Sequence, residues 1–288
     1  MRIRYLFAAI ALCTGSAHCE PAVWQISHGE GSTVWLLGSV HYLRDSDYPL
    51  PPIIDEIYAR ADDLVMEIDL DDLNPLDVQT RFMQAAMLPA TQSLSSVLDA
   101  DVYADTEHTA RSLGLELTAL EPFEPWLVAL TIMDLGMARN GFRADQGLEQ
   151  HLLMRARRDR KNVDGLETLA DQIGVFDGLS YSEQQALLGQ TLEEIGSPQR
   201  EMDELLDAWR SGRLETLAAK LSESFVDFPG LYEALVVHRN ERWISRIENL
   251  AAQPGHTLVV VGALHLVGED NVVEMLRARG LEVTQISP

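Results

Sequence analysis

The fold is decided by Val34-Trp35-Leu36-Leu37-Gly38-Ser39-Val40-His41 and Leu258-Val259-Val260-Val261-Gly262-Ala263-Leu264-His265. Each stretch is an apolar run that ends in Gly-x-x-His. A short apolar run bounded by a turn residue is typical of a strand that is buried on both faces. Ligands of α/β proteins bind beyond the carboxyl ends of such strands. If the two strands are neighbours, we expect His41 and His265 to converge on one site.

The sequence around these stretches predicts an α/β fold with a mixed sheet, built from N- and C-terminal strands, and a large helical insertion over about residues 75–250. The first two strands are expected to form a hairpin, and the chain is expected to end in a βαβ-like segment. Strands are predicted over 23–27, 33–40, 63–69, 161–167, 257–261 and 282–286. Individual helices are predicted over 53–60 and 269–279, and over 168–176 within the insertion.

The repeated motif is the first functional signal. A single histidine after a strand is most often a hydrogen-bonded structural residue. Two histidines in the same local frame instead favour a shared polar site. The glycine three residues before each histidine allows either a close backbone approach or an unusual backbone conformation at the strand end.

Glu67 is a carboxylate inside the apolar run Val65-Met66-Glu67-Ile68. A buried carboxylate needs a cationic partner or a metal ion, or its pKa must rise. Together with His41 and His265 it would offer two imidazoles and a carboxylate. Such a set suits zinc, manganese or cobalt and leaves open positions for water.

Two further segments are ambiguous. Glu167 stands at a strand-to-helix junction and is either structural or part of the same site. The run His238-Arg239-Asn240-Glu241-Arg242-Trp243 is either a solvated helix face with Trp243 packed inward, or a segment that points Arg239 and Asn240 into the site. In the second case, Arg239 would stabilise an oxyanion or hold a carboxylate.

The N-terminus has the layout of a secretory signal peptide. Arg2 and Arg4 precede the apolar run 5–13, and small and polar residues follow. Cleavage is expected near Cys19, so residues 1–19 would be a leader and residues 20–288 a single periplasmic or secreted domain. Both cysteines, Cys13 and Cys19, lie in this leader. No later segment approaches the roughly 20 apolar residues of a membrane span, so none is expected in the mature chain.

The overall charge narrows the class of partner. The chain has 22 Lys and Arg against 45 Asp and Glu, a formal charge of −23 at pH 7. Such a surface repels phosphates, so a nucleic-acid partner is not expected.

The sequence resembles the TraB/PrgY/GumN family, the bacterial relatives of the animal Tiki proteases, from about residue 23 to residue 286. The resemblance rests on five blocks in order, which are 38–41, 65–67, 165–168 with Gln172, 239–240 and 262–265. Ser39 stands where many relatives have threonine, which keeps the hydroxyl group. The resemblance implies an α/β core with paired motifs and, in Tiki, a metal-dependent peptidase that uses manganese or cobalt. In that pattern His41 and His265 match the motif histidines, and Glu67 matches the acidic position.

The leading hypothesis is therefore a metal-dependent hydrolase, namely a peptidase that acts on a peptide or small protein. His41, His265 and Glu67 would hold the metal, or Glu67 would act as the base, while Arg239 and Asn240 would position the substrate or stabilise an oxyanion. The alternative is a binding protein that sequesters a peptide or signal in the same cleft without cleaving it. A serine hydrolase is disfavoured because the chain has no Gly-x-Ser-x-Gly element.

Overall fold

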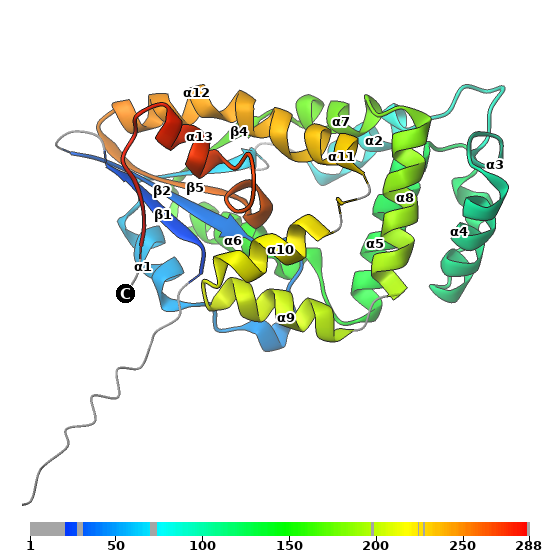
Figure 1. The fold of residues 1–288 in the computed structure, drawn as a ribbon, viewed down its shortest axis with the longest axis horizontal. Coiled ribbons are helices and arrows are strands. Elements are labelled where there is room, and N and C mark those ends of the chain that lie inside the picture. The colour runs from blue at the N-terminus through cyan, green and yellow to red at the C-terminus, as the bar shows by residue number, and fades with distance from the viewer. Residues whose placement is uncertain are drawn as a thin grey trace, which may run out of the picture.

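A mixed β-sheet organises the described part of the chain, with strands in the order β4-β3-β5-β2-β1-β6 (Figure 1). The computed structural model describes residues 21–27, 31–69, 74–196, 199–223, 225–226 and 228–286. The strands are β1 (Val23–Ser27), β2 (Ser32–Ser39), β3 (Asp63–Ile68), β4 (Asn162–Glu167), β5 (Gly255–Gly262) and β6 (Val283–Gln285). Strands β4, β3, β5 and β2 are parallel, whereas β1 is antiparallel to both of its neighbours.

The two strands that precede Gly-x-x-His are neighbours, as the sequence predicted. Strands β2 and β5 pair in parallel, with Gly38 opposite Val261 and Ser39 opposite Gly262. The β1–β2 hairpin is also confirmed. The apolar residues of β5 are almost completely buried because helices cover both faces of the sheet, which explains their continuous apolar run.

The C-terminal segment differs from a simple βαβ unit. Strand β6 pairs with β1, so β2 and β1 separate it from β5. Strands β3 and β2 already occupy both edges of β5, and β6 pairs with the outer edge of β1 instead. The preceding helix α13 (Val272–Ala278) starts later than predicted, because Asp270 has a left-handed φ of 47° and Asn271 caps the helix.

The predicted helical insertion is confirmed, with β4 embedded in it. In Figure 1, α12 and α13 lie above the sheet, and α1 and α6 lie on its other side. The longer helices are α1 (Pro52–Arg60), α2 (Pro75–Ala85), α4 (Ala100–Ser112), α5 (Pro125–Arg139), α6 (Leu148–Asp159), α7 (Leu169–Asp177), α8 (Tyr181–Gly196), α9 (Gln199–Arg210), α10 (Leu214–Glu223) and α12 (His238–Ala252). Shorter elements are α3 (Leu94–Val97), α11 (Pro229–Tyr232), a π-helix (Glu233–Val237) and the 3-10 turns Asp45–Asp47, Leu117–Leu120, Ala144–Gln146 and Ala263–His265.

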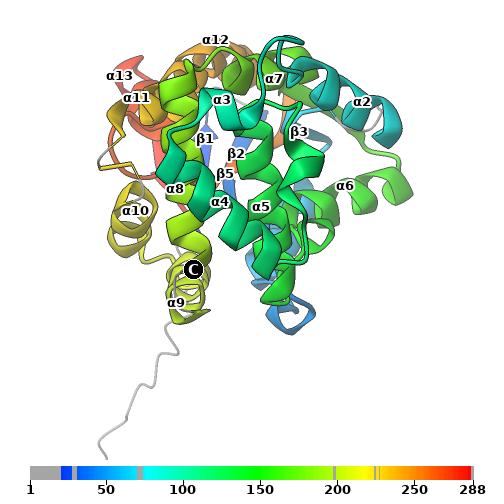
Figure 2. The ribbon, with the colours of Figure 1, turned by 90° about the vertical axis from the view of Figure 1, so that its right-hand side faces the viewer.

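The apolar core has a sheet part and a helical part. Trp35, Trp209 and Trp243 are fully buried in the sheet part. In the helical part, Trp126 of α5 stacks on Phe176 with ring centroids 5.7 Å apart. Figure 2 shows α4, α5 and α8 standing in front of the strands, so the helical part faces one end of the sheet.

The sequence also predicts a leader over residues 1–19, a single domain over residues 20–288 and no membrane span in that domain. The leader, residues 1–19, lies outside the described residues, and the boundaries of the 20–288 domain stay predictions. Within the described ranges, every helix is too short or too polar to cross a lipid bilayer.

Candidate functional site

Three predicted site residues surround Gly262, the last residue of β5. Glu67 belongs to β3, His41 follows the end of β2, and His265 closes the 3-10 turn after β5. A Cβ atom built on Gly262 would lie 3.4 Å from Glu67 Oε1, 3.5 Å from His41 Nε2 and 3.6 Å from His265 Cδ2. The close approach expected at this glycine is therefore present, whereas its φ of −50° is open to any residue.

Glu67 is a buried carboxylate with two strong partners. Its Oε1 accepts a hydrogen bond from the Gly262 N–H at 2.7 Å, and its Oε2 accepts one from Arg239 Nη2 at 2.5 Å. Burial by itself would raise the pKa of Glu67, but Arg239, His265, His41 and the Gly262 N–H together outweigh it, and the pKa falls to about 2. The sequence predicted a cationic partner, a metal ion or a raised pKa for this buried carboxylate. The structure shows a cationic partner, Arg239.

Arg239 joins Glu67 to the second predicted carboxylate, Glu167 at the end of β4. Its Nε lies 3.1 Å from both Glu167 carboxylate oxygens, and its Nη2 lies 2.9 Å from Oε2. Arg242, whose side chain is half exposed, also donates to Glu167 at 3.1 Å. Two buried carboxylates therefore share one buried guanidinium.

His265 is buried and held through its Nδ1 atom. Asn240 Oδ1 lies 2.7 Å from this nitrogen, and Asn240 Nδ2 donates to the Asp270 carbonyl at 2.8 Å. The amide thus presents its oxygen to the ring, which assigns the proton to Nδ1. Burial lowers the pKa of His265 to about 3, so the ring is neutral at neutral pH. Arg239 Nη1 lies 3.2 Å from the Nε2 atom of His265. The ring centroids of Trp243 and His265 are 4.5 Å apart.

His41 has the opposite character. Its side chain is 60% exposed, and its Nδ1 lies 2.7 Å from Glu149 Oε1. The Ser39 hydroxyl donates to the same carboxylate oxygen. The negative charge of Glu149 raises the pKa of His41 to about 9. The two motif histidines therefore differ in protonation at neutral pH.

An irregular helix places Arg239 and Asn240. The π-helix Glu233–Val237 leads directly into α12, and its Leu235 carbonyl lies 3.4 Å from Arg239 Nη1. Single π-turns inside helices are frequent at functional sites. Arg239, Asn240 and Trp243 are all buried. Arg239 and Asn240 thus contact the site residues, and Trp243 is packed inward as the alternative interpretation expected.

Sequence comparison agrees with the order of motifs. Residues 22–285 match the model of the TraB/PrgY/gumN family. The chain belongs to this family. The resemblance inferred from the five sequence blocks, over about residues 23–286, is confirmed over nearly its whole length.

The relatives in this family differ in what is known of them. The chain is 28% identical to the uncharacterized protein YbaP of Escherichia coli K12, over 96% of this chain and 98% of YbaP. It is 24% identical to Metalloprotease TIKI2 of Danio rerio, over 88% of this chain and 58% of that protein. It is likewise 24% identical to human Metalloprotease TIKI1, over 93% of this chain and 64% of that protein. No solved structure matches the chain.

The centre formed by His41, Glu67 and His265 has donor atoms of the types that bind divalent metal ions. Glu149 and Asn240 each hold an imidazole at Nδ1, so the two Nε2 atoms would be the nitrogens available to a metal ion, beside the Glu67 carboxylate. In the described part of the chain, however, no three His, Cys, Asp or Glu side chains are arranged to hold an ion. Arg239 instead occupies bonding positions on Glu67 and His265. The residue types of the centre are suitable for binding a metal ion. Arg239 would have to move away from Glu67 and His265 before they could bind one.

The sequence reasoning missed Glu149 as a contact of His41. It is a carboxylate in the first turn of α6, where acidic residues are common for reasons of helix stability alone. Its one distinguishing signal is Gly147 immediately before the helix. A Cβ atom at Gly147 would collide with the His41 carbonyl oxygen, so α6 begins against the motif histidine.

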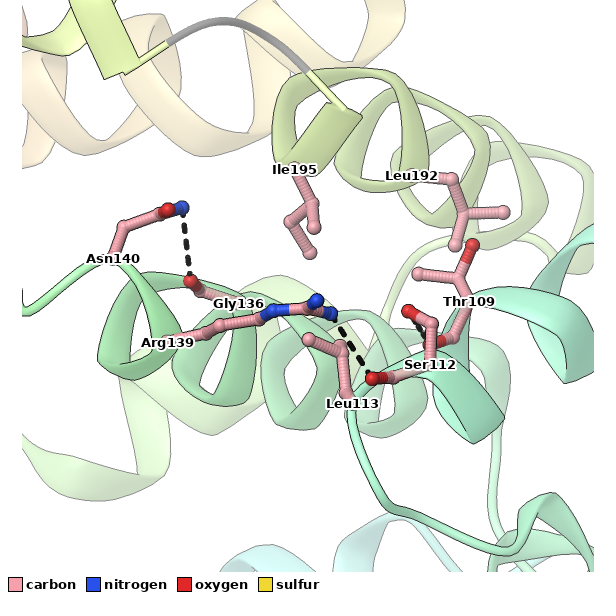
Figure 3. A pocket seen from close by; sticks show the side chains of 8 residues that line it. All are labelled: Thr109, Ser112, Leu113, Gly136, Arg139, Asn140, Leu192 and Ile195. Atoms are coloured by element: carbon pink, nitrogen blue, oxygen red, sulfur yellow. Dashed lines mark hydrogen bonds between the residues drawn. The ribbon is translucent and has the colours of Figure 1, made fainter.

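A separate cavity of about 220 Å³ lies between α4, α5 and α8. Figure 3 shows Arg139 reaching across it to the Ser112 carbonyl oxygen, at 3.0 Å. Leu192 and Ile195 of α8 form its apolar side. None of the predicted site residues lines it, so it is separate from the Gly262 centre.

Proposed function

We propose that the chain is an exported hydrolase that cleaves peptide bonds with a divalent metal ion at His41, Glu67 and His265. The observation that carries this proposal is the convergence of these three side chains on Gly262 at the strand ends. The metalloproteases among its distant relatives support it. Manganese or cobalt is the expected ion, zinc is the alternative, and a peptide or small protein is the expected substrate.

The residues of the centre would have distinct roles. A bound divalent ion would polarise the scissile carbonyl group and make a water molecule more acidic. Glu67, ionised by its contact with Arg239, would be a ligand or the base that takes the proton from water. Arg239 would stabilise the negative charge that develops on the substrate oxygen. Glu167 binds Arg239 from the other side and would hold the guanidinium in place.

Asn240 has a different role from the one first expected. It is fully buried, and its amide is engaged by His265 and the Asp270 carbonyl. Direct contact with a substrate is therefore not part of the proposal. Asn240 would act through His265, by fixing the imidazole so that Nε2 faces the centre.

The test is a cleavage assay combined with metal analysis. The purified protein is incubated with a peptide library and added Mn(II), Co(II) or Zn(II), beside His41→Ala, His265→Ala and the control His108→Ala. His108 is an exposed histidine of α4. We expect cleavage and bound metal in the wild type and control, and neither in the two site variants. Unchanged cleavage in both site variants would reject the proposed roles.

A second candidate is a binding protein that sequesters a peptide or signal without cleaving it. The contacts of Arg239 with Glu67 and His265 favour it, because they satisfy the atoms that would bind a metal. This candidate predicts a metal-free protein that binds peptide intact. The acidic chain would then prefer basic peptides.

A further inference from the structure

Glu149 makes two contacts that a carboxylate at a helix N-terminus does not need. Such residues ordinarily face solvent, where they interact with the helix dipole. The Glu149 side chain is only 16% exposed, and its Oε1 lies 2.7 Å from His41 Nδ1. The Ser39 hydroxyl donates to the same oxygen from the buried end of β2. The carboxylate is thus turned inward, toward the motif histidine.

The backbone holds this pair in register. The segment after β2 and the segment before α6 run side by side and are joined by backbone hydrogen bonds. The joining hydrogen bonds run from the Leu148 N–H to the Val40 carbonyl at 3.1 Å, and between Leu43 and Arg143 in both directions at 3.3 and 2.9 Å. Gly147 permits the close contact, because a side chain there would strike the His41 carbonyl.

The consequence is a fixed orientation for an otherwise exposed imidazole. A histidine with an exposed side chain can rotate and can carry its proton on either nitrogen. The bond to Glu149 favours the proton on Nδ1, which leaves Nε2 directed at Gly262 and the Glu67 and His265 side chains. A carboxylate behind a histidine is a recurrent means of orienting an imidazole that acts at a metal or as a base.

We propose that Glu149 is a positioning residue for His41, and that Ser39 holds its carboxylate in place. Glu149 keeps the proton of neutral His41 on Nδ1 and points Nε2 into the centre. The part of this proposal that concerns the rate of reaction rests on the proposed function. The part that concerns the imidazole itself does not.

The first measurement reads the imidazole directly. The protein with ¹⁵N-labelled histidine is studied by NMR above the pKa of His41, beside Glu149→Met, Glu149→Gln and Ser39→Ala. We expect His41 protonated at Nδ1 in the wild type and shifted toward the Nε2-protonated form in Glu149→Met. Glu149→Gln should shift less, because its amide oxygen can still accept the bond.

The same tautomer in the wild type and Glu149→Met would overturn the proposal. Should Glu149→Met fail to fold, an unshifted tautomer in both remaining variants would overturn it.

The second measurement separates positioning from helix stability. The control is Glu274→Met, which removes an exposed first-turn carboxylate of α13 that pairs with Arg277. We expect kcat of Glu149→Met to fall roughly 10- to 100-fold with little change in KM, partial recovery in Glu149→Gln, and no loss in the control. An equal loss in the control would overturn the role. If the wild type cleaves no peptide with any metal, the proposed function fails, and the tautomer measurement still decides the role of Glu149.

Discussion

Arg239 donates a hydrogen bond to the Nε2 atom of His265 across 3.2 Å. This is the atom with which His265 would bind a metal ion, because Asn240 holds the other ring nitrogen. The same guanidinium also forms ion pairs with Glu67 and Glu167. Arg239 therefore stabilises the centre and would compete with a metal ion for the donor atoms of Glu67 and His265. This competition links folding stability to function.

Replacing Arg239 should destabilise the fold strongly. Arg239→Gln leaves two buried carboxylates without their shared cation, and breaking a buried ion pair costs about 3 to 5 kcal/mol. The matched control is Arg242→Gln, because Arg242 contacts the same Glu167 from a half-exposed position. That control should cost less than about 1 kcal/mol. Urea unfolding measures both, and equal midpoints for the two variants would contradict the role assigned to Arg239.

Gly262→Ala should remove function with little change in stability. The added methyl group would lie 3.4 to 3.6 Å from Glu67, His41 and His265, which is ordinary van der Waals contact, so the fold should lose no more than about 1.5 kcal/mol. It would nevertheless fill the space where the three side chains meet. The control is Gly189→Ala in α8, which meets nothing within 4 Å and should be slightly stabilising. Wild-type kcat/KM in Gly262→Ala would contradict a reaction at this point.

Metal binding should raise the thermal stability of the protein through His265. A ligand that binds only the folded state at about 100 times its Kd adds about 2.7 kcal/mol. We expect Mn(II) or Co(II) to raise the Tm of the wild type and of His108→Ala, and a chelator to reverse the shift. His265→Ala should show no shift. A shift of wild-type size in that variant would place the ion elsewhere.

A pH-dependent contribution to stability is expected away from the centre, at Asp47. This buried carboxylate accepts three hydrogen bonds from Arg44, at 2.8, 3.0 and 3.0 Å. Burial would raise the pKa of Asp47, but the bonds from Arg44 outweigh it and the pKa is lowered. Because the folded state releases the proton more readily than the unfolded state, the contribution is complete above the ordinary Asp pKa of about 3.9. It is lost as the pH falls through the lower folded-state value.

Asp47→Asn should therefore cost about 2 to 3 kcal/mol at pH 7, and the difference from wild type should shrink below about pH 4. Urea unfolding at pH 7, 4 and 3 measures it. The control is Asp145→Asn, which removes an exposed carboxylate paired with Arg143. A stability difference for Asp47→Asn that is the same at every pH would contradict the assignment.

Much of the architecture was predictable because it depends on local signals. The continuous apolar runs before His41 and His265 require strands covered on both faces, and the hairpin and β4 follow from turn residues and apolar flanks. Helix α13 starts three residues later than predicted, because the cap at Asn271 decides the start. The position of β6 depended on which edge of the sheet it joined, which no local pattern encodes.

The sequence by itself determined the residue types at the site and the strand ends that carry them: His41, Glu67, Glu167 and His265. Only the tertiary structure decided their partners. Helix α12 brings Arg239 to both carboxylates, and α6 turns Glu149 toward His41. These contacts depend on how helices are oriented over the sheet, and burial and charge then give two identical motif histidines pKa values shifted in opposite directions.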